Sequence, residues 1–203
     1  GRCGGRWRGR RRAHAPSPPS PSPAGHRIGR MTAALDGVRA CIGLGANLGQ
    51  PTLALRHAAD ALAALPETRL LALSRFYRTP AWGRVDQPDF INAAALVHTR
   101  LAPGVLLESL LRIEREAGRE RGPESRWGPR VLDLDLLLYG GQVLDRPGLR
   151  VPHPHLHERA FALVPLAEVA AAEPFPGHGT VAEALRAIDG TGVEPVQGVA
   201  GMD

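Results

Sequence analysis

The feature that most constrains this chain is the run from Val131 to Leu138, in which leucines alternate with two aspartates. Successive side chains of a β-strand point to opposite faces, so this pattern predicts a strand that buries its leucines and presents Asp133 and Asp135 together on the other face. Cα atoms two positions apart lie roughly 6.6 Å from each other, and two such carboxylates can hold a pair of metal ions. Without cations, the two negative charges would repel each other. The leucines expected on the buried face are Leu132, Leu134, Leu136 and Leu138.

An arginine-rich loop is expected directly before this strand, over residues 118–130. A loop of about a dozen residues with several glycines and prolines is typical of a lid or a binding loop. Guanidinium groups bind phosphate oxygens bidentately and stay charged, so arginines beside paired carboxylates indicate a magnesium–polyphosphate site. Two alternatives stay open locally: the aspartates form an exposed strand edge, or they pair with Arg126 and Arg130. The arginines of the loop are Arg119, Arg121, Arg126 and Arg130.

The net charge of +5 reflects the N-terminal region more than the rest of the chain. Residues 1–30 contain eight of the 25 basic residues and no acidic residue, which leaves 17 arginines against 20 acidic residues in the remainder. A nucleic-acid-binding protein is expected to have a basic body with stacking aromatic side chains. This body is net acidic and aromatic residues make up 4% of the chain, so nucleic acid is not an expected partner.

The first part of the chain, residues 1–37, is rich in arginine, proline and serine, and we expect it to be disordered because it cannot build a hydrophobic core. Three explanations are open for residues 1–30: a targeting presequence, a nucleic-acid-binding arm, or sequence upstream of a true first residue at Met31. We favour the last of these. The folded domain is expected over residues 38–190, and a flexible tail over residues 191–203.

Cysteine content and hydropathy bear on the location of the protein. Cys3 and Cys41 are too few for a disulfide framework, and Cys41 lies in an apolar run typical of a small buried thiol. No segment approaches the roughly 20 apolar residues of a membrane span, and no secretory signal pattern is visible. These features predict a cytoplasmic protein without a membrane partner.

Hydrophobic periodicity predicts an α+β fold with a mostly antiparallel sheet packed by helices. The predicted elements follow the order βαββαβ, which is that of a ferredoxin-like core. Gly140 and Gly141 permit a tight hairpin in which residues 142–144 pair back on the Asp-x-Asp strand. The other expected strands cover residues 38–44, 69–78 and 90–99, and the expected helices cover residues 51–65, 103–117, 158–171 and 180–188.

Two further motifs have structural explanations. The glycine-rich segment 43–49 follows a strand and precedes a helix, but its spacing does not fit the dinucleotide-binding fingerprint. We interpret it as a turn in which Asn47 can cap the helix. His153, His155 and His157 are close in sequence, but their spacing suits no common zinc site, and we favour a contact from one histidine to a phosphate or a base.

Taken together, these motifs resemble the 6-hydroxymethyl-7,8-dihydropterin pyrophosphokinase family of folate biosynthesis. The resemblance extends from about residue 38 to residue 189, and the segment from Arg126 to Asp135 is highly specific to the family. The chain departs from the family pattern at Ala46, Leu111 and Pro154. Further matching segments are residues 43–49, 76–80, 86–93, 112–114 and 151–153.

The resemblance implies transfer of the β,γ-pyrophosphoryl group of ATP to the hydroxymethyl oxygen of 6-hydroxymethyl-7,8-dihydropterin, with release of AMP. Asp133 and Asp135 would bind two magnesium ions, and Arg119, Arg121 and Arg130 would stabilise the phosphate charge. The implied pterin-binding residues are Thr79, Pro80, Trp82, Phe90, Asn92 and Phe161. The implied nucleotide-binding residues are Glu114, Arg121, Trp127, Leu136, His153 and Arg159.

The implied partners are these two small molecules, and we expect the protein to be a monomer. The loops over residues 79–89 and 118–130 would close over both substrates to exclude water. Two alternatives remain: another magnesium-dependent phosphotransferase, or a homologue that binds pterin or nucleotide without turnover.

Overall fold

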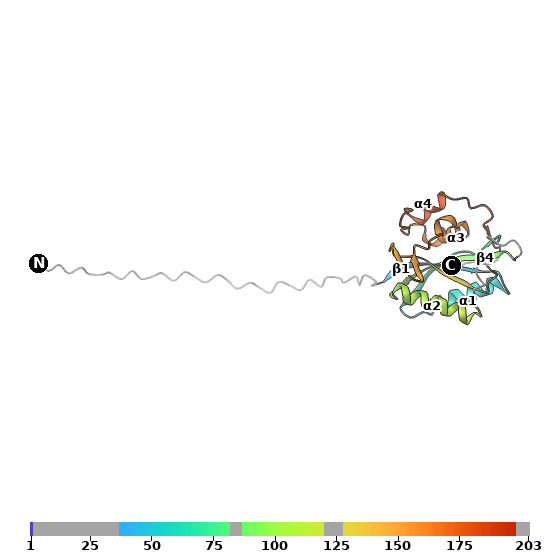
Figure 1. Cartoon of the computed structure of the whole chain (residues 1–203), viewed down its shortest axis with the longest axis horizontal. Helices are drawn as coiled ribbons and strands as arrows, with labels where there is room; N and C mark the ends of the chain where they lie inside the picture. Colours follow the sequence, from blue (N-terminus) through green and yellow to red (C-terminus); the bar gives the residue numbers. More distant parts are fainter. Residues whose placement is uncertain (2–36, 82–86, 120–127, 198–203) are drawn as a thin grey trace. The chain divides into compact units, whose positions relative to one another are not determined.

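The computed structural model describes residue 1 and residues 37–81, 87–119 and 128–197. Apart from residue 1, all of these belong to one unit, Leu35–Asp203 (Figure 1). The expected disordered tail and the assignment of Met31 as the first residue fall almost entirely on residues outside the described part of the chain.

A six-stranded sheet forms the centre of this unit, with the strand order β5-β1-β4-β3-β8 and with β2 also paired to β4. All of these pairings are antiparallel. β1 and β4 pair along almost their whole length, from Val38 opposite Thr99 to Ala46 opposite Ile91. The strands are β1 (Val38–Ala46), β2 (Thr68–Leu73), β3 (Tyr77–Thr79), β4 (Phe90–Thr99), β5 (Asp133–Tyr139) and β8 (Glu194–Pro195).

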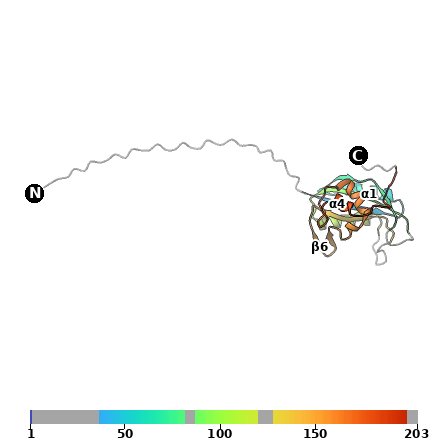
Figure 2. The same ribbon diagram turned by 90° about the horizontal axis from the view of Figure 1, so that it is seen from above.

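Helices cover both faces of the sheet (Figure 1). α1 and α2 pack on one face, where Leu55 and Leu106 are fully buried, and α3 and α4 pack on the other, where Leu163 and Val181 are fully buried. Seen from above, α4 lies over the sheet (Figure 2). No helix in the described part of the chain has the length and apolar character needed to cross a lipid bilayer. The helices are α1 (Pro51–Ala63), α2 (Pro103–Glu116), the 3-10 helix η2 (Leu156–Glu158), α3 (Ala160–Ala170) and α4 (Val181–Arg186).

This arrangement confirms the predicted ferredoxin-like βαββαβ core. The core elements follow the order β1-α1-β2-β4-α2-β5, and their strands lie in the order β5-β1-β4-β2. α1 and α2 begin at Pro51 and Pro103, as predicted, because the fixed φ and missing N–H of proline suit the first turn of a helix. The predicted helix over 158–171 is divided between η2 and α3.

The strand β5 departs from the predicted alternation near its C-terminal end. The leucines up to Leu136 lie in the core against α1 and α2, as predicted. A β-bulge then shifts the register, because Ile42 lies opposite Leu136 whereas Cys41 lies opposite Leu138. The extra residue reverses the alternation, so Leu138 belongs to the core of α3 and α4, and its predicted place with the other leucines is wrong.

Cys41 is a buried thiol, as predicted. Its side chain is 1% exposed, and burial raises the pKa of the thiol to about 12. The thiolate is therefore strongly disfavoured, and the residue acts as a small apolar group in the core.

The hairpin that follows β5 differs from the prediction. Residues 142–144 were expected to pair back on β5, but β6 (Leu144–Arg146) instead pairs with β7 (Leu149–Val151) in a separate two-stranded sheet. Pro147 and Gly148 form the turn between them, and Gly148 adopts a φ of 78°. Proline followed by a glycine with positive φ is typical of a tight turn, and this turn directs the chain after residue 146 into β7 and away from β5.

The predicted strand over 69–78 is divided into β2 and β3 by residues 74–76. β3 pairs with β4 on one side and with β8 on the other, where Tyr77 lies opposite Pro195. The Val196 N–H also donates to the carbonyl of Phe76 at 2.8 Å. The expectation of a flexible tail from residue 191 is therefore corrected for residues 194–196, which extend the sheet.

Candidate active site

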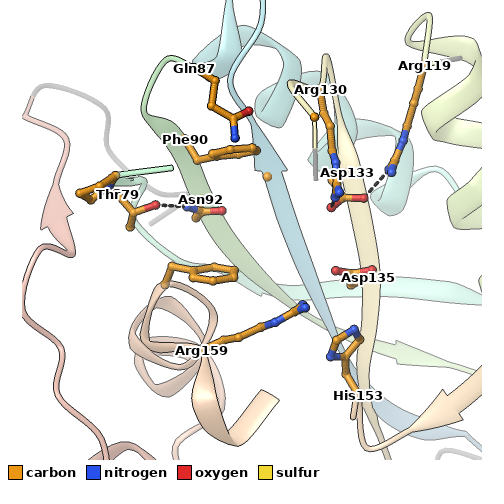
Figure 3. A pocket seen from close by; sticks show the side chains of 14 residues that line it. Thr79, Gln87, Phe90, Asn92, Arg119, Arg130, Asp133, Asp135, His153 and Arg159 are labelled. Atoms are coloured by element: carbon orange, nitrogen blue, oxygen red, sulfur yellow. Dashed lines mark hydrogen bonds and ion pairs between the residues drawn. The ribbon is translucent and has the colours of Figure 1, made fainter. Parts of the chain in front are cut away.

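A cavity of about 310 Å³ opens where β1 ends, β4 and β5 begin, and the chain enters α3 (Figure 3). Antiparallel pairing brings these strand ends to the same edge of the sheet. The cavity is lined by Gly45, Thr79, Pro80, Gln87, Phe90, Asn92, Arg119, Gly128, Arg130, Asp133, Asp135, His153, Arg159 and Phe161.

A row of residues across three neighbouring strands lies at the centre of this cavity. Gly45 of β1 lies opposite Asn92 of β4 and also opposite Asp133 of β5, and directly paired residues point to the same face of a sheet. A Cβ atom at Gly45 would lie 3.1 Å from the side-chain oxygen of Asn92. Gly45 therefore keeps space open between the amide and the carboxylate. The interpretation of Gly45 as part of a turn is therefore wrong: it lies in β1, two residues after Gly43 and on the same face of the strand.

One side of the cavity carries aromatic and neutral polar groups. The buried Asn92 donates from Nδ2 to the Thr79 hydroxyl oxygen at 2.8 Å, which fixes the amide and leaves its Oδ1 atom near Gly45. Phe90 and Phe161 line the same cavity from β4 and α3. Two aromatic rings and an oriented amide suit a flat heterocycle with hydrogen-bonding edges.

The opposite side carries the charged groups that the sequence singles out (Figure 3). Asp133 forms ion pairs with both Arg119 and Arg130. Arg119 also pairs with Glu114, a fully buried carboxylate of α2 that accepts a 2.8 Å hydrogen bond from the backbone N–H of Leu134. These bonds hold the end of α2 and the start of β5 together around the guanidinium group.

Asp135 lies next to Asp133 on the same face of β5, as the alternation predicts (Figure 3). Burial, and then the charge of Asp133, raise the pKa of Asp135 to about 6, although Arg159 and Arg130 oppose this shift. A carboxylate whose charge is disfavoured in this way gains when a cation binds.

Arg159 and His153 complete the charged side. The Nε atom of Arg159 is buried without a hydrogen-bond partner, as is that of Arg130, among the described residues. Burial and the charge of Arg159 lower the pKa of His153 to about 4, so its imidazole is neutral near pH 7. The backbone N–H of His155 points to Nδ1 of His153 at 3.4 Å, which favours the tautomer with a proton on Nε2. Each side chain can therefore donate to an anionic or polar ligand.

Asn47 does not cap α1, so the predicted helix cap is wrong. The cap position is Gln50, which makes no side-chain cap bond. Asn47 is buried and instead connects two loops: its Nδ2 donates to Oε1 of Gln87 at 3.2 Å and to the carbonyl of Pro88 at 3.0 Å. Its Oδ1 accepts from the backbone N–H of Arg130 at 2.7 Å. One side chain thus joins the segment before β4 to the segment before β5.

A second cavity, of about 720 Å³, adjoins the first and shares Asp135 and His153 with it. Its lining is largely aliphatic near α2 and β5, with Asp145 and Arg150 of the β6–β7 hairpin at its edge. The positions Leu111 and Pro154, at which the sequence departs from the family pattern, both line it. Its apolar residues are Leu107, Leu111, Leu134, Leu136, Pro147, Leu149 and Pro154.

Most of the residues singled out from the sequence come together at these two cavities. Leu136 lines the second cavity only, and Glu114 lies behind the charged side, where it holds Arg119. Trp82, Arg121, Arg126 and Trp127 lie outside the described residues. The first cavity contains Thr79, Pro80, Phe90, Asn92, Arg119, Arg130, Asp133, Asp135, His153, Arg159 and Phe161.

Comparison with curated proteins gives close relatives. The chain is 46% identical over 160 residues to 2-amino-4-hydroxy-6-hydroxymethyldihydropteridine pyrophosphokinase of Pseudomonas aeruginosa, covering 79% of this chain and 98% of that protein. It is 48% identical over 159 residues to the protein of the same name from Methylorubrum extorquens, covering 78% of this chain and 99% of that one.

Solved structures agree on the fold. The crystal structure of a triple mutant of Plasmodium falciparum HPPK-DHPS matches with a TM-score of 0.57 at 12% identity, covering 74% of this chain and 43% of that chain. The wild-type protein matches with a TM-score of 0.54 at 13% identity, covering 74% of this chain and 41% of that one. At these identities, the likeness concerns the fold alone.

The family model for 7,8-dihydro-6-hydroxymethylpterin-pyrophosphokinase matches residues 41–171, which is more than half of the chain. Every residue named as lining either cavity lies within this range. The chain therefore belongs to the 7,8-dihydro-6-hydroxymethylpterin-pyrophosphokinase family.

Proposed function

We propose that this protein transfers the β,γ-pyrophosphoryl group of ATP to the hydroxymethyl oxygen of 6-hydroxymethyl-7,8-dihydropterin, with AMP as the second product. The observation that carries the proposal is the pair Asp133 and Asp135: both line a cavity with two aromatic rings, and Asp135 also lines a larger, mostly aliphatic cavity. This arrangement supports a reaction in which a flat acceptor and a nucleotide donor meet at the two carboxylates.

The first cavity is the proposed site of the pterin. Phe90 and Phe161 would stack on the ring, and Asn92, held by Thr79, would hydrogen-bond to its edge. Pro80 lies beside Thr79 in the lining. Trp82 stays a predicted contact from the sequence.

The second cavity is the proposed site of the nucleoside. Its leucines would contact the base, and His153 lies where both cavities meet, so its neutral ring can donate to the phosphates that link them. Leu111 in place of a polar side chain makes this site more apolar than the family pattern suggests. Arg121 and Trp127 stay predicted nucleotide contacts.

The donor set at Asp133 and Asp135 fits magnesium, which prefers carboxylate oxygens completed by water and substrate phosphates. No group of three or more potential ligand side chains converges within the described residues, so phosphates or water would have to supply the other ligands. We propose two magnesium ions at these carboxylates. When bound, the ions neutralise polyphosphate charge and align the attacking and leaving oxygens.

The arginines of this chain perform the remaining electrostatic work. Arg119 and Arg130 neutralise Asp133 in the ligand-free protein and can turn to phosphate oxygens when a polyphosphate enters. Arg159 extends toward Asp135 (Figure 3), and its buried Nε has no hydrogen-bond partner in the described part of the chain, so it can donate to the transferred group. These groups need little rearrangement as charge develops during transfer.

The proposal also includes the oligomeric state and the location of the protein. A monomer stays a prediction from the sequence. Two small-molecule substrates, one of them ATP, support a cytoplasmic location.

The reaction is tested by incubating the full chain with magnesium, ATP and 6-hydroxymethyl-7,8-dihydropterin and separating the nucleotide products. We expect AMP that appears only when the pterin is added, together with a diphosphorylated pterin. Pterin-dependent ADP would mean a simple phosphotransferase, and absence of any turnover with retained ligand binding would favour a binding homologue.

Asn47 allows a prediction about the two loops. In the Asn47→Asp variant, a carboxylate replaces the Nδ2 donor and faces the oxygens of Gln87 and Pro88, while the bond from the Arg130 N–H is kept. We expect the KM for the pterin to rise about tenfold, because two hydrogen bonds give way to repulsion. Steady-state kinetics with each substrate varied in turn measures the change.

Gln50→Glu is the matched control, because it adds the same negative charge three residues away, at an exposed side chain without a cap bond. A KM for the pterin that is unchanged in Asn47→Asp, or raised equally in Gln50→Glu, would show that the hydrogen bonds of Asn47 do not organise the site.

A further inference from the structure

A compact polar cluster lies outside both cavities and joins α3 to the strand that carries Thr79. Tyr77 donates from its hydroxyl to Oε2 of Glu168 at 2.8 Å, and Arg75 donates from Nε to Oε1 of Glu168 at 3.1 Å. Arg75 also donates from Nη2 to the Tyr77 hydroxyl oxygen at 3.1 Å, which closes the cluster. The backbone N–H of Arg75 reaches both oxygens of Glu168 at 3.3 Å.

The position of this cluster links two sides of the first cavity. Tyr77 is in β3, two residues before Thr79, whose hydroxyl holds Asn92. Glu168 is in α3, seven residues after Phe161, which is close to two helical turns and therefore on a similar face of the helix. The cluster thus ties the element that carries Phe161 to the element that carries Thr79.

The sheet side of the cluster is firmly held. The buried Ser74 donates from its N–H to the carbonyl of Ala94 at 2.9 Å, and its hydroxyl oxygen accepts from the Ala94 N–H at 2.9 Å. Arg75 is therefore fixed to β4, the strand that also carries Phe90 and Asn92. Because β3 has three residues and lies between β4 and the two-residue β8, its attachment to α3 is a substantial part of its support.

The protonation of the cluster suits this role. Burial, and then the hydrogen bond and the charge of Glu168, raise the pKa of Tyr77, so its hydroxyl remains a donor at neutral pH. Tyr77 is buried, with 5% of the residue exposed, and its hydroxyl is held by both Arg75 and Glu168. Ion pairs at partly exposed positions add little stability, so the main effect of this cluster is geometric.

We propose that Arg75, Tyr77 and Glu168 form a positioning clamp that sets the gap between Phe161 on α3 and the Thr79–Asn92 side of the cavity, and thereby the affinity for the pterin. This inference rests on the proposed function, since it assigns the flat substrate to that gap. None of the three residues lines either cavity, so each acts through another residue.

The test compares Glu168→Ala, which removes the centre of the clamp, with Tyr77→Phe, which keeps the ring in the core and removes only the hydroxyl. We expect Glu168→Ala to raise the KM for the pterin about tenfold, the equivalent of one hydrogen bond to a charged group, and Tyr77→Phe to raise it by a smaller factor. The kcat at saturating pterin and the KM for ATP should stay near the wild-type values.

Arg39→Gln is the matched control, because Arg39 of β1 pairs with Glu173 after α3 at 3.1 Å and thus also links the sheet to this helical layer. The side chain of Arg39 is 53% exposed, which is close to the 57% of the Arg75 side chain. This variant should keep the pterin KM of the wild type.

The outcomes separate the clamp from the reaction. General loss of folded protein would lower the apparent kcat of Glu168→Ala and leave its KM unchanged, and that result would overturn the clamp. Equal increases in both KM values, or a wild-type pterin KM in Tyr77→Phe and Glu168→Ala alike, would also overturn it. If the wild-type chain itself forms no AMP with the pterin, that result contradicts the proposed function and not the clamp alone.

Discussion

Replacing Asp133 or Asp135 by asparagine should lower kcat by at least about 10³-fold, because either change removes a charged ligand from the proposed magnesium site while keeping the shape of the side chain. The Asp133→Asn variant would also lose the ion pairs with Arg119 and Arg130, whereas Asp135 forms no ion pair among the described residues. Single-turnover and steady-state assays with magnesium, ATP and the pterin measure the loss.

The matched control is Asp60→Asn on the exposed surface of α1, which removes a carboxylate remote from both cavities. Its kcat should equal that of the wild type. An Asp135→Asn variant that retains a rate within a few-fold of the wild type would exclude this carboxylate from the metal site.

Asp135→Asn should lower kcat but raise the stability of the protein in the absence of magnesium and nucleotide. Burial raises the pKa of Asp135 to about 6, above its ordinary value of 3.8, so the folded protein binds this proton more tightly than the unfolded chain. The free energy of unfolding should therefore fall as pH rises from about 4 to about 6 and stay lower above that range. Asp135→Asn lacks this loss and should be more stable at pH 7 by on the order of 3 kcal/mol.

Urea unfolding in EDTA at pH 4.5 and pH 7 tests this claim. The advantage of Asp135→Asn over the wild type should be larger at pH 7. An equal difference at both pH values would mean that the charge of Asp135 is not strained by its surroundings. A residue whose removal stabilises the protein and stops the reaction is kept for function.

The Asp-x-Asp strand shows what the sequence can predict. A period of two fixes which side chains share a face, so the neighbouring positions of Asp133 and Asp135 followed directly from the pattern. The predicted face of Leu138 is wrong because a β-bulge depends on how β1 pairs with β5. The sequence of one strand does not reveal its register with the neighbouring strand.

Asn47 shows a second limit. Its place between a strand and a helix is typical of a cap, since local propensity is all that a short segment reveals. Its actual partners, Gln87, Pro88 and Arg130, are distant in sequence and meet it only after the sheet has formed. The contribution of Gly45 to the cavity could not be predicted for the same reason, because it depends on Asn92 in the neighbouring strand.

Arg119 and Arg130 should respond differently to substitution, although both pair with Asp133. Arg119→Ala and Arg130→Ala should each lower kcat by about 10²-fold or more, since each removes a donor for phosphate charge. Arg119 is also 13% exposed and pairs with the buried Glu114, whereas Arg130 is 23% exposed and pairs with Asp133. Arg119→Ala should therefore also lower the free energy of unfolding by about 3 kcal/mol, and Arg130→Ala by less than about 1 kcal/mol.

A second substitution separates the two roles of Arg119. Glu114→Gln in the Arg119→Ala background removes the buried charge and retains an oxygen that can accept the N–H of Leu134. The double variant should recover most of the lost stability in urea unfolding and none of the lost kcat. Recovery of turnover together with stability would mean that Arg119 serves only to neutralise Glu114, and the phosphate would then depend on Arg130 and Arg159 alone among the described arginines of the cavity.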